Sequence, residues 1–318
     1  MLKYFIKRVL QAVPLLLLIT ILCFALIDFA PYDAIDARIT DKMTKEQIEQ
    51  MKIDAGLYDP MPVQYLRWLN NLLHGDLGQS LINRTNIASD LKEKIPNTII
   101  LVLPAYATAF LLAIGLGLLA GRYKDSWVDK IINSMSSIGL AVPTFFVALL
   151  FIYYFGLKLD LFPVMGMHSF NDDSFKDFLH HFVLPYSVLT IGFLPDLVRY
   201  VRSSTITQFE EDYVTVQKAF GSGSGTILLR HVSKNVLLPM ITKLGLALPM
   251  LVTGAVITET VFAWPGIGVY FTTAIRNLDY PIVMAILVLS GTLVILGNLI
   301  SDIICALIDP RVREGVKK

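Results

Sequence analysis

The sequence predicts an all-α membrane protein with six transmembrane helices. Of its 318 residues, 54% are hydrophobic, and the mean hydropathy of +0.60 is too high for an ordinary soluble domain. The apolar residues form six runs between polar loops, and each has about the twenty residues that a helix needs to cross a bilayer core of about 30 Å. The net charge of +1 gives no indication of nucleic-acid binding. Cys23 and Cys305 lie inside apolar runs and indicate neither a disulfide nor a metal site.

The first predicted span covers about residues 9–29 and follows Lys3, Lys7 and Arg8. A basic start before an apolar run is also typical of a secretory signal. This run is long for a signal, however, and has no clear small-x-small cleavage site. We therefore expect residues 1–29 to form a cytoplasmic start and an uncleaved first span.

A long polar region, residues 30–96, follows and is expected on the external side. Two interpretations are open: an external subdomain with short surface helices, or a solvated connection between two spans. The remainder, residues 97–318, is expected to be a five-span core with a cytoplasmic loop at about residues 203–239.

The later spans are expected at about residues 97–120, 133–155, 180–200, 236–262 and 281–307. Basic residues give their orientation, because they concentrate in cytoplasmic loops. The loops assigned to the cytoplasm, with the C-terminus, carry Arg122, Lys124, Lys130, Arg199, Arg202, Lys218, Arg230, Lys234, Lys243, Arg311, Arg313, Lys317 and Lys318. The short loops on the other side carry only Lys158, Lys176 and Arg276. Both termini are therefore expected in the cytoplasm.

The second span carries small residues at four-residue spacing, namely Ala113, Gly117 and Gly121. Small residues on one helix face let a neighbouring helix approach closely. This spacing predicts a packing seam and is no evidence of homodimerisation.

The fourth span contains Pro185, Pro195 and Asp196. Helix-breaking and polar residues at membrane depth are tolerated mainly where they face protein or a water-filled cavity. This span is therefore a candidate lining of a substrate pathway, and Glu259 of the fifth span is a further candidate. A position of Asp196 at the cytoplasmic interface is the alternative interpretation.

The cytoplasmic loop begins with a short amphipathic pattern after Glu211. Asp212 stands at its start, and Tyr213, Val216 and Phe220 recur at helical spacing before Gly221. An acidic start and a terminal glycine favour a helix over about residues 212–220. Either the membrane surface or the groove of a partner protein could cover its apolar stripe.

The glycine- and serine-rich run at residues 221–225 lacks the lysine of a phosphate-binding loop, so it is expected to be a turn. A second helix is expected from Thr226 through Asn235, leading into the fifth span at Pro239. His231 has no partner at metal-ligand spacing and is interpreted as a surface residue.

At this loop the chain resembles the permeases of ATP-binding cassette importers. The likeness is carried by Glu211-Asp212-Tyr213-Val214, Ala219, Gly221, Leu228-Leu229-Arg230-His231, Asn235 and Leu237-Leu238-Pro239. It is closest to the first permease of the dipeptide, oligopeptide and nickel group, and it covers nearly the whole chain. Further matching runs are Pro96-Asn97-Thr98, Glu259-Thr260-Val261-Phe262, Trp264-Pro265-Gly266-Ile267-Gly268 and Leu307-Ile308-Asp309-Pro310-Arg311.

The resemblance implies the type I importer permease fold, with a second homologous permease, two ATPases that bind ATP and Mg, and an external substrate-binding protein as partners. It implies no cofactor on this chain and no enzyme activity of its own. The residues implied in ATPase coupling are Glu211, Asp212, Tyr213, Val216, Ala219, Phe220, Gly221, His231, Asn235 and Pro239. The chain departs from the group at Gln217, Phe220 and residues 223–225, so contacts around that turn are not transferred.

Di- or oligopeptides are the expected substrate class, and nickel, a metal chelate or glutathione are the alternatives within the group. A channel or secondary transporter that works without ATP is the alternative from a different class. It would need charges within the bilayer or inverted repeats, and neither is clear in this sequence. An intramembrane enzyme would need convergent catalytic groups at depth, whereas Asp28, Asp196 and Asp302 all lie near predicted span ends.

Overall fold

The computed structural model describes residues 2–29, 39, 43–54, 56, 58–245 and 255–308 of the chain. Within these ranges the fold is helical, as predicted, and extended residues pair only in the isolated bridges Gln79 with Asn86 and Ser169 with Asp172. The centre of the predicted fifth span and the run at residues 309–311 lie outside the described residues. The side chains of Asp28, Asp302 and Cys305 are also outside them.

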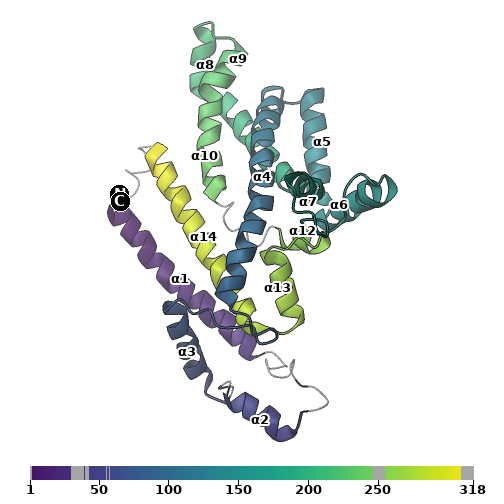
Figure 1. The fold of residues 1–318 in the computed structure, drawn as a ribbon. Coiled ribbons are helices and arrows are strands. Elements are labelled where there is room, and N and C mark those ends of the chain that lie inside the picture. Colours follow the sequence, from purple (N-terminus) through teal and green to yellow (C-terminus); the bar gives the residue numbers. More distant parts are fainter. Residues whose placement is uncertain are drawn as a thin grey trace. The chain divides into compact units, whose positions relative to one another are not determined.

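The helices follow one another along the chain as Figure 1 shows. They are α1 (Leu2–Asp28), α2 (Lys45–Asp54), α3 (Met61–Leu73), α4 (Ile87–Arg122), α5 (Trp127–Ala141), α6 (Thr144–Phe151), the π-helix η2 (Ile152–Lys158), α7 (Phe175–Phe209), α8 (Asp212–Ala219), α9 (Ser224–Ile227), the π-helix η3 (Leu228–Val232), α10 (Ser233–Gly245), α12 (Val256–Val261), α13 (Ile267–Arg276) and α14 (Tyr280–Ile308).

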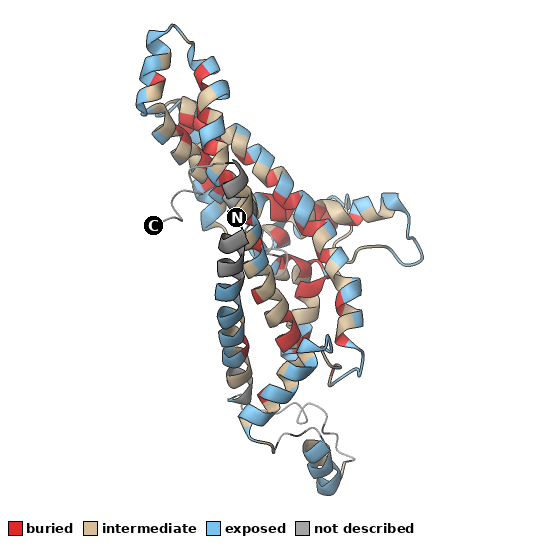
Figure 2. Cartoon of the chain, turned by 90° about the vertical axis from the view of Figure 1, so that its left-hand side faces the viewer, coloured by how far each residue is buried: buried red, intermediate tan, exposed pale blue. Residues whose placement is uncertain are grey.

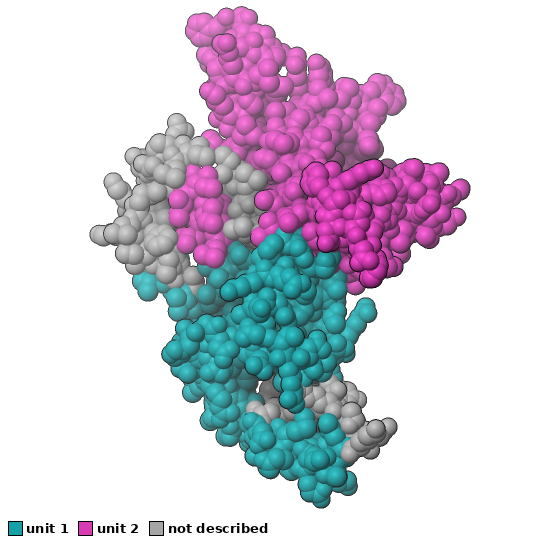
Figure 3. Space-filling view, viewed as in Figure 1, with its two compact units in different colours: residues 1–98, 265–295 teal, residues 99–264, 296–318 magenta. Residues whose placement is uncertain are grey.

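The chain divides into two compact units, coloured separately in Figure 3. Unit 1 contains residues 1–98 and 265–295, and unit 2 contains residues 99–264 and 296–318. Helices α4 and α14 contribute residues to both units. Each unit is described by itself below.

Among the described residues, α4, α7 and residues 280–301 of α14 are long and apolar enough to cross a membrane. A fourth crossing is present if α5 and the α6–η2 segment form one span, although they are bent by 94°. Pro143 explains the bend, because proline removes a helical hydrogen bond and favours extended backbone at the preceding residue. Val142 accordingly has φ −87° and ψ 121°. Helix α1 contains the shorter apolar stretch Val13–Ala25.

Helix α4 begins at Ile87, well before the predicted second span. Asn86 explains this early start, because its side-chain oxygen accepts a hydrogen bond from the Ser89 backbone N–H at 3.1 Å.

In unit 2, α4 and α7 pack along the predicted seam of small residues. A Cβ atom on Gly117 would lie 2.4 Å from Cβ of Val201, and one on Gly121 would lie 2.5 Å from Cβ of Thr205. Ala113 is fully buried in the same cluster. The predicted seam is therefore confirmed, since larger side chains at the two glycines would separate the helices.

In unit 1, α3 packs against α1 through aromatic side chains. The hydroxyl groups of Thr20 and Tyr65 lie 2.9 Å apart, and the Phe24 ring meets that of Tyr65 edge to face. The helix α3 within the polar region therefore contacts the first apolar helix.

Large apolar side chains remain exposed over much of α1, α5 and α6, as the pale blue ribbon in Figure 2 indicates. Exposed examples are Leu18, Leu22, Ile131, Ile138, Phe145 and Leu149. Such extensive apolar exposure marks surfaces that lipid or partner subunits cover.

Candidate functional site

The predicted short helix after Glu211 is present as α8, and its end has the expected geometry. Gly221 has φ +78°, and its N–H donates to the Lys218 carbonyl at 2.9 Å. The N–H of Ser222 donates to the Gln217 carbonyl at 3.0 Å. These two bonds form a Schellman motif, which requires a left-handed residue that glycine adopts without strain. The prediction that Gly221 ends this helix is confirmed.

One side of α8 is anchored to α7 and α10. Val214 is 1% exposed within the main cluster of unit 2. The Tyr213 hydroxyl donates to Gln208 Oε1 at 3.0 Å, and Asn235 Nδ2 donates to the same oxygen at 2.9 Å. Burial raises the pKa of the Tyr213 phenol, so this donor stays protonated at neutral pH. Tyr213 and Asn235, both predicted site residues, thus meet at Gln208, which the sequence analysis had not singled out.

Towards its C-terminal end, α8 carries two apolar groups with little cover in this chain. Val216 is 50% exposed and Phe220 is 82% exposed. An exposed aromatic side chain at the end of a well-anchored helix is the kind of group that a partner's pocket buries.

The turn after Gly221 leads into a continuous helical segment of α9, η3 and α10. Ile227 and Val232 are fully buried and hold this segment against the core. Figure 1 shows α8 and α9 side by side beyond the end of α10. The predicted second helix is therefore present, but it starts at Ser224, before Thr226, and runs through Pro239. His231 is half-buried on η3, and Ala219 is the last residue of α8.

The predicted pathway residues fall into two environments. Pro185, Pro195 and Glu259 are buried, and Pro195 would lie 2.5 Å from a Cβ atom on Gly139. Asp196 is exposed and lines a cavity of about 610 Å³ between α5 and α7.

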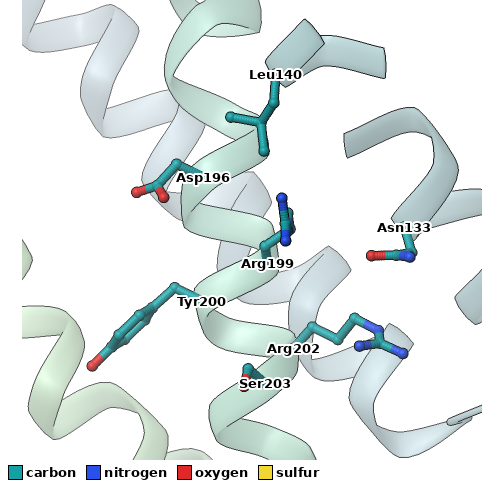
Figure 4. Close-up of a pocket in the computed structure, with 7 residues that line it drawn as sticks. All are labelled: Asn133, Leu140, Asp196, Arg199, Tyr200, Arg202 and Ser203. Atoms are coloured by element: carbon teal, nitrogen blue, oxygen red, sulfur yellow. The ribbon is translucent and has the colours of Figure 1, made fainter. Parts of the chain in front are cut away.

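Figure 4 shows the side chains of this cavity. They are Asn133 and Leu140 of α5 with Asp196, Arg199, Tyr200, Arg202 and Ser203 of α7. Arg202 donates from Nε and Nη2 to the two carboxylate oxygens of Asp129, at 2.5 and 2.7 Å. Lys243 Nζ lies 2.8 Å from Asp196 Oδ2 and 4.7 Å from the centre of the Tyr200 ring. The sequence carries no local signal for these two ion pairs, because each joins different helices.

In unit 1, two of the matching sequence runs bind each other. Asn97 Nδ2 donates to the Pro265 carbonyl at 2.9 Å, and the Ile267 N–H donates to Thr98 Oγ1 at 2.9 Å. Thr98 is 1% exposed. We call these two hydrogen bonds the paired-motif contact; they join the Asn97-Thr98 pair to the Pro265-Gly266-Ile267 run.

Two further contacts join the same parts of unit 1. The Tyr270 hydroxyl donates to Asp90 Oδ2 at 2.8 Å, and burial together with this hydrogen bond raises the pKa of the Tyr270 phenol. Ser80 Oγ donates to Asp279 Oδ2 at 2.5 Å, and the Leu81 N–H donates to Asp279 Oδ1 at 3.1 Å. Asp279 is 2% exposed, and these donors supply hydrogen bonds to its buried carboxyl group.

Among the residues that the structure describes, no group of three or more His, Cys, Asp or Glu side chains could hold a metal ion.

Comparison with known proteins identifies the family. The family described as "Binding-protein-dependent transport system inner membrane component" matches residues 113–314, and its N-terminal counterpart matches residues 1–102. The oligopeptide transport system permease protein AppB of Bacillus subtilis is 37% identical over 314 residues, covering 98% of this chain and 99% of that protein. A putative peptide permease protein of Brucella suis is 34% identical over 317 residues, covering 98% and 99%.

A solved structure of the MetNI methionine ABC transporter in an inward-facing conformation is similar in fold, with a TM-score of 0.56. The match covers 69% of this chain and 96% of that chain at 15% identity. Because family models and relatives together match nearly the whole length, this chain belongs to the binding-protein-dependent transport system inner membrane components, as a permease subunit of an ATP-binding cassette importer in the cytoplasmic membrane.

Proposed function

We propose that this permease imports di- or oligopeptides, together with a second homologous permease, two ATPases and an external peptide-binding protein. The observation that carries the substrate class is the 37% identity, over nearly the full length of both proteins, to an oligopeptide permease. ATP and Mg then bind to the partner ATPases. The topology is six spans with both termini in the cytoplasm, arranged as residues 1–29, 30–96 and 97–318.

The coupling element is α8 with Gly221. Its anchored residues, Tyr213 and Val214, make it move with α7 and α10, and its exposed residues, Val216 and Phe220, contact the ATPase. Closure of the ATPase pair on ATP then carries α8 as a rigid lever, and the spans change between inward-open and outward-open states.

Peptide uptake by vesicles tests this function. The complete transporter is reconstituted with the peptide-loaded binding protein outside and with or without ATP at the ATPases. We expect accumulation of peptide only with ATP and with all subunits present. Uptake without ATP by this chain alone would instead support a channel or secondary transporter.

A further inference from the structure

Some side chains that line the cavity between α5 and α7 form ion pairs, and others have no partner among the described residues. Arg202 is bound to Asp129, and Asp196 is bound to Lys243. In contrast, the Arg199 guanidinium has no ion pair or hydrogen-bond partner among the described residues. The cavity therefore holds one guanidinium whose charge no direct contact with the described residues neutralises.

Two neutral donors line the same cavity. The Asn133 amide and the Ser203 hydroxyl also have no side-chain hydrogen-bond partner among the described residues. Arg199 and Ser203 lie four residues apart on α7, which places them on one face of that helix. Asn133 faces them from α5 (Figure 4).

The ion pair between Arg202 and Asp129 fixes this arrangement, because it joins α7 to α5 beside the three donors. Figure 4 shows Asp196 and Tyr200 projecting from α7 on the side away from Asn133. The Asp196 carboxylate, held by Lys243, therefore does not occupy the space between Arg199 and Asn133.

We propose that Arg199, Asn133 and Ser203 form a binding site for a carboxylate. A guanidinium binds a carboxylate through two parallel hydrogen bonds, and an amide and a hydroxyl complete the coordination of its oxygens. The occupant is the C-terminal carboxylate of the transported peptide as it passes the mouth of this cavity. This step rests on the proposed peptide import, and it assigns to the permease itself a preference for peptides with a free C-terminus.

The cavity volume of about 610 Å³ is consistent with this occupant. Ligand sites of about 300–1,000 Å³ are typical of small molecules. A short peptide can therefore place its end group at Arg199 while the rest of the chain remains in the cavity.

The test measures the uptake of two forms of one peptide, with a free C-terminal carboxylate or with a C-terminal amide. Both are tested in vesicles that contain the complete transporter. The affinity of the external binding protein for each peptide form is measured separately. The preference of the binding protein can then be separated from that of the permease in the uptake ratio. For Arg199→Gln we expect the uptake ratio of free acid to amide to fall about tenfold, as loss of a charged hydrogen bond predicts. Amide uptake should stay at the wild-type rate, which shows that the variant is folded and coupled to ATP.

Arg276→Gln is the matched control. Arg276 is an exposed arginine at the end of α13, outside the cavity, so its substitution should leave the ratio unchanged. Arg199→Lys keeps the charge but loses the planar pair of donors, and it should lower the ratio by less than Arg199→Gln does.

Three results would overturn the proposal. Equal loss of acid and amide uptake in Arg199→Gln would show a structural role for Arg199, and an unchanged ratio would show that no carboxylate binds there. An effect seen only with anionic phospholipid in the vesicles, or only with added inorganic phosphate, would assign the site to a phosphate group. Absence of ATP-dependent uptake of either peptide by the wild type would instead contradict the proposed import function, and the inference with it.

Discussion

Helix α8 and the paired-motif contact use their side chains in opposite ways. In the paired-motif contact, Asn97 and Thr98 bind the chain's own backbone at Pro265 and Ile267. On α8, by contrast, Phe220 and Val216 point outward with most or half of their surface exposed. Burial thus separates the two regions: the side chains of the paired-motif contact stabilise this chain, and the exposed side chains of α8 are available to another.

This comparison predicts that substitutions on α8 reduce transport without lowering stability. Substitutions at the paired-motif contact should lower stability without reducing transport by the folded protein. The largest effect is expected for Gly221→Val. Gly221 has φ +78°, a conformation that costs a residue with a side chain about 1–2 kcal/mol and a β-branched one more. We expect transport to be abolished while the amount of protein in the membrane stays near wild type, measured by uptake and immunoblotting.

Gly223→Val is the matched control for that substitution. Gly223 lies two residues away with φ −68° and ψ 149°, and a Cβ atom there would meet nothing within 4 Å. Normal uptake in this variant would show that the effect at position 221 comes from backbone conformation. If both valine variants transport normally, the end of α8 does not limit coupling.

Phe220→Ala should have the next largest effect. Its side chain is 82% exposed, so its removal should leave the melting temperature of the isolated permease unchanged. Loss of a buried aromatic anchor from an interface costs about 2 kcal/mol or more, so we expect the affinity for the ATPase to fall at least about tenfold in a binding titration. A lower melting temperature with unaltered affinity would place Phe220 among the stabilising residues instead.

Gly117→Ala tests how much the close approach of α4 and α7 at the small-residue seam of unit 2 contributes to stability. A Cβ atom there would lie 2.4 Å from Cβ of Val201, and such overpacking costs about 1–3 kcal/mol. Gly115→Ala on the same helix is the control, because nothing lies within 4 Å of its Cβ position. Thermal denaturation in detergent should show destabilisation for the first variant only. Equal melting temperatures would mean that α4 and α7 can separate freely.

Thr98→Val should affect stability alone. It leaves the Ile267 N–H without the acceptor seen at 2.9 Å, which costs about 1–3 kcal/mol for a buried group. Thr273→Val, at an exposed position of α13, serves as the control. Uptake per folded transporter should be unchanged. Reduced uptake at full stability would contradict the division of roles between the two regions.

The sequence predicted local features better than contacts through space. The helix after Glu211 and its end at Gly221 were predictable because an acidic start, helical spacing and a terminal glycine are all adjacent in the chain. Pro143 was visible inside the third predicted span, but the bend of 94° was not, since its size depends on packing.

The contacts that organise the candidate site could not be predicted in this way. The ion pair of Arg202 with Asp129 joins two helices that are distant in sequence, and so does that of Lys243 with Asp196. The paired-motif contact joins residues on opposite sides of the predicted core in sequence, so neither run alone indicates the other. Asp196 was singled out from its polarity at membrane depth, while Arg199, one helical turn further, was read only as a topology signal.

The central claim is that α8 presents Phe220 to an ATPase, and a photoreactive amino acid at position 220 of the assembled transporter tests it most directly. We predict that illumination attaches the ATPase subunit to position 220, and that it does not do so from position 170, where Phe170 is 94% exposed in the predicted external loop. Capture of only lipid or of the external binding protein at position 220 would contradict the claim.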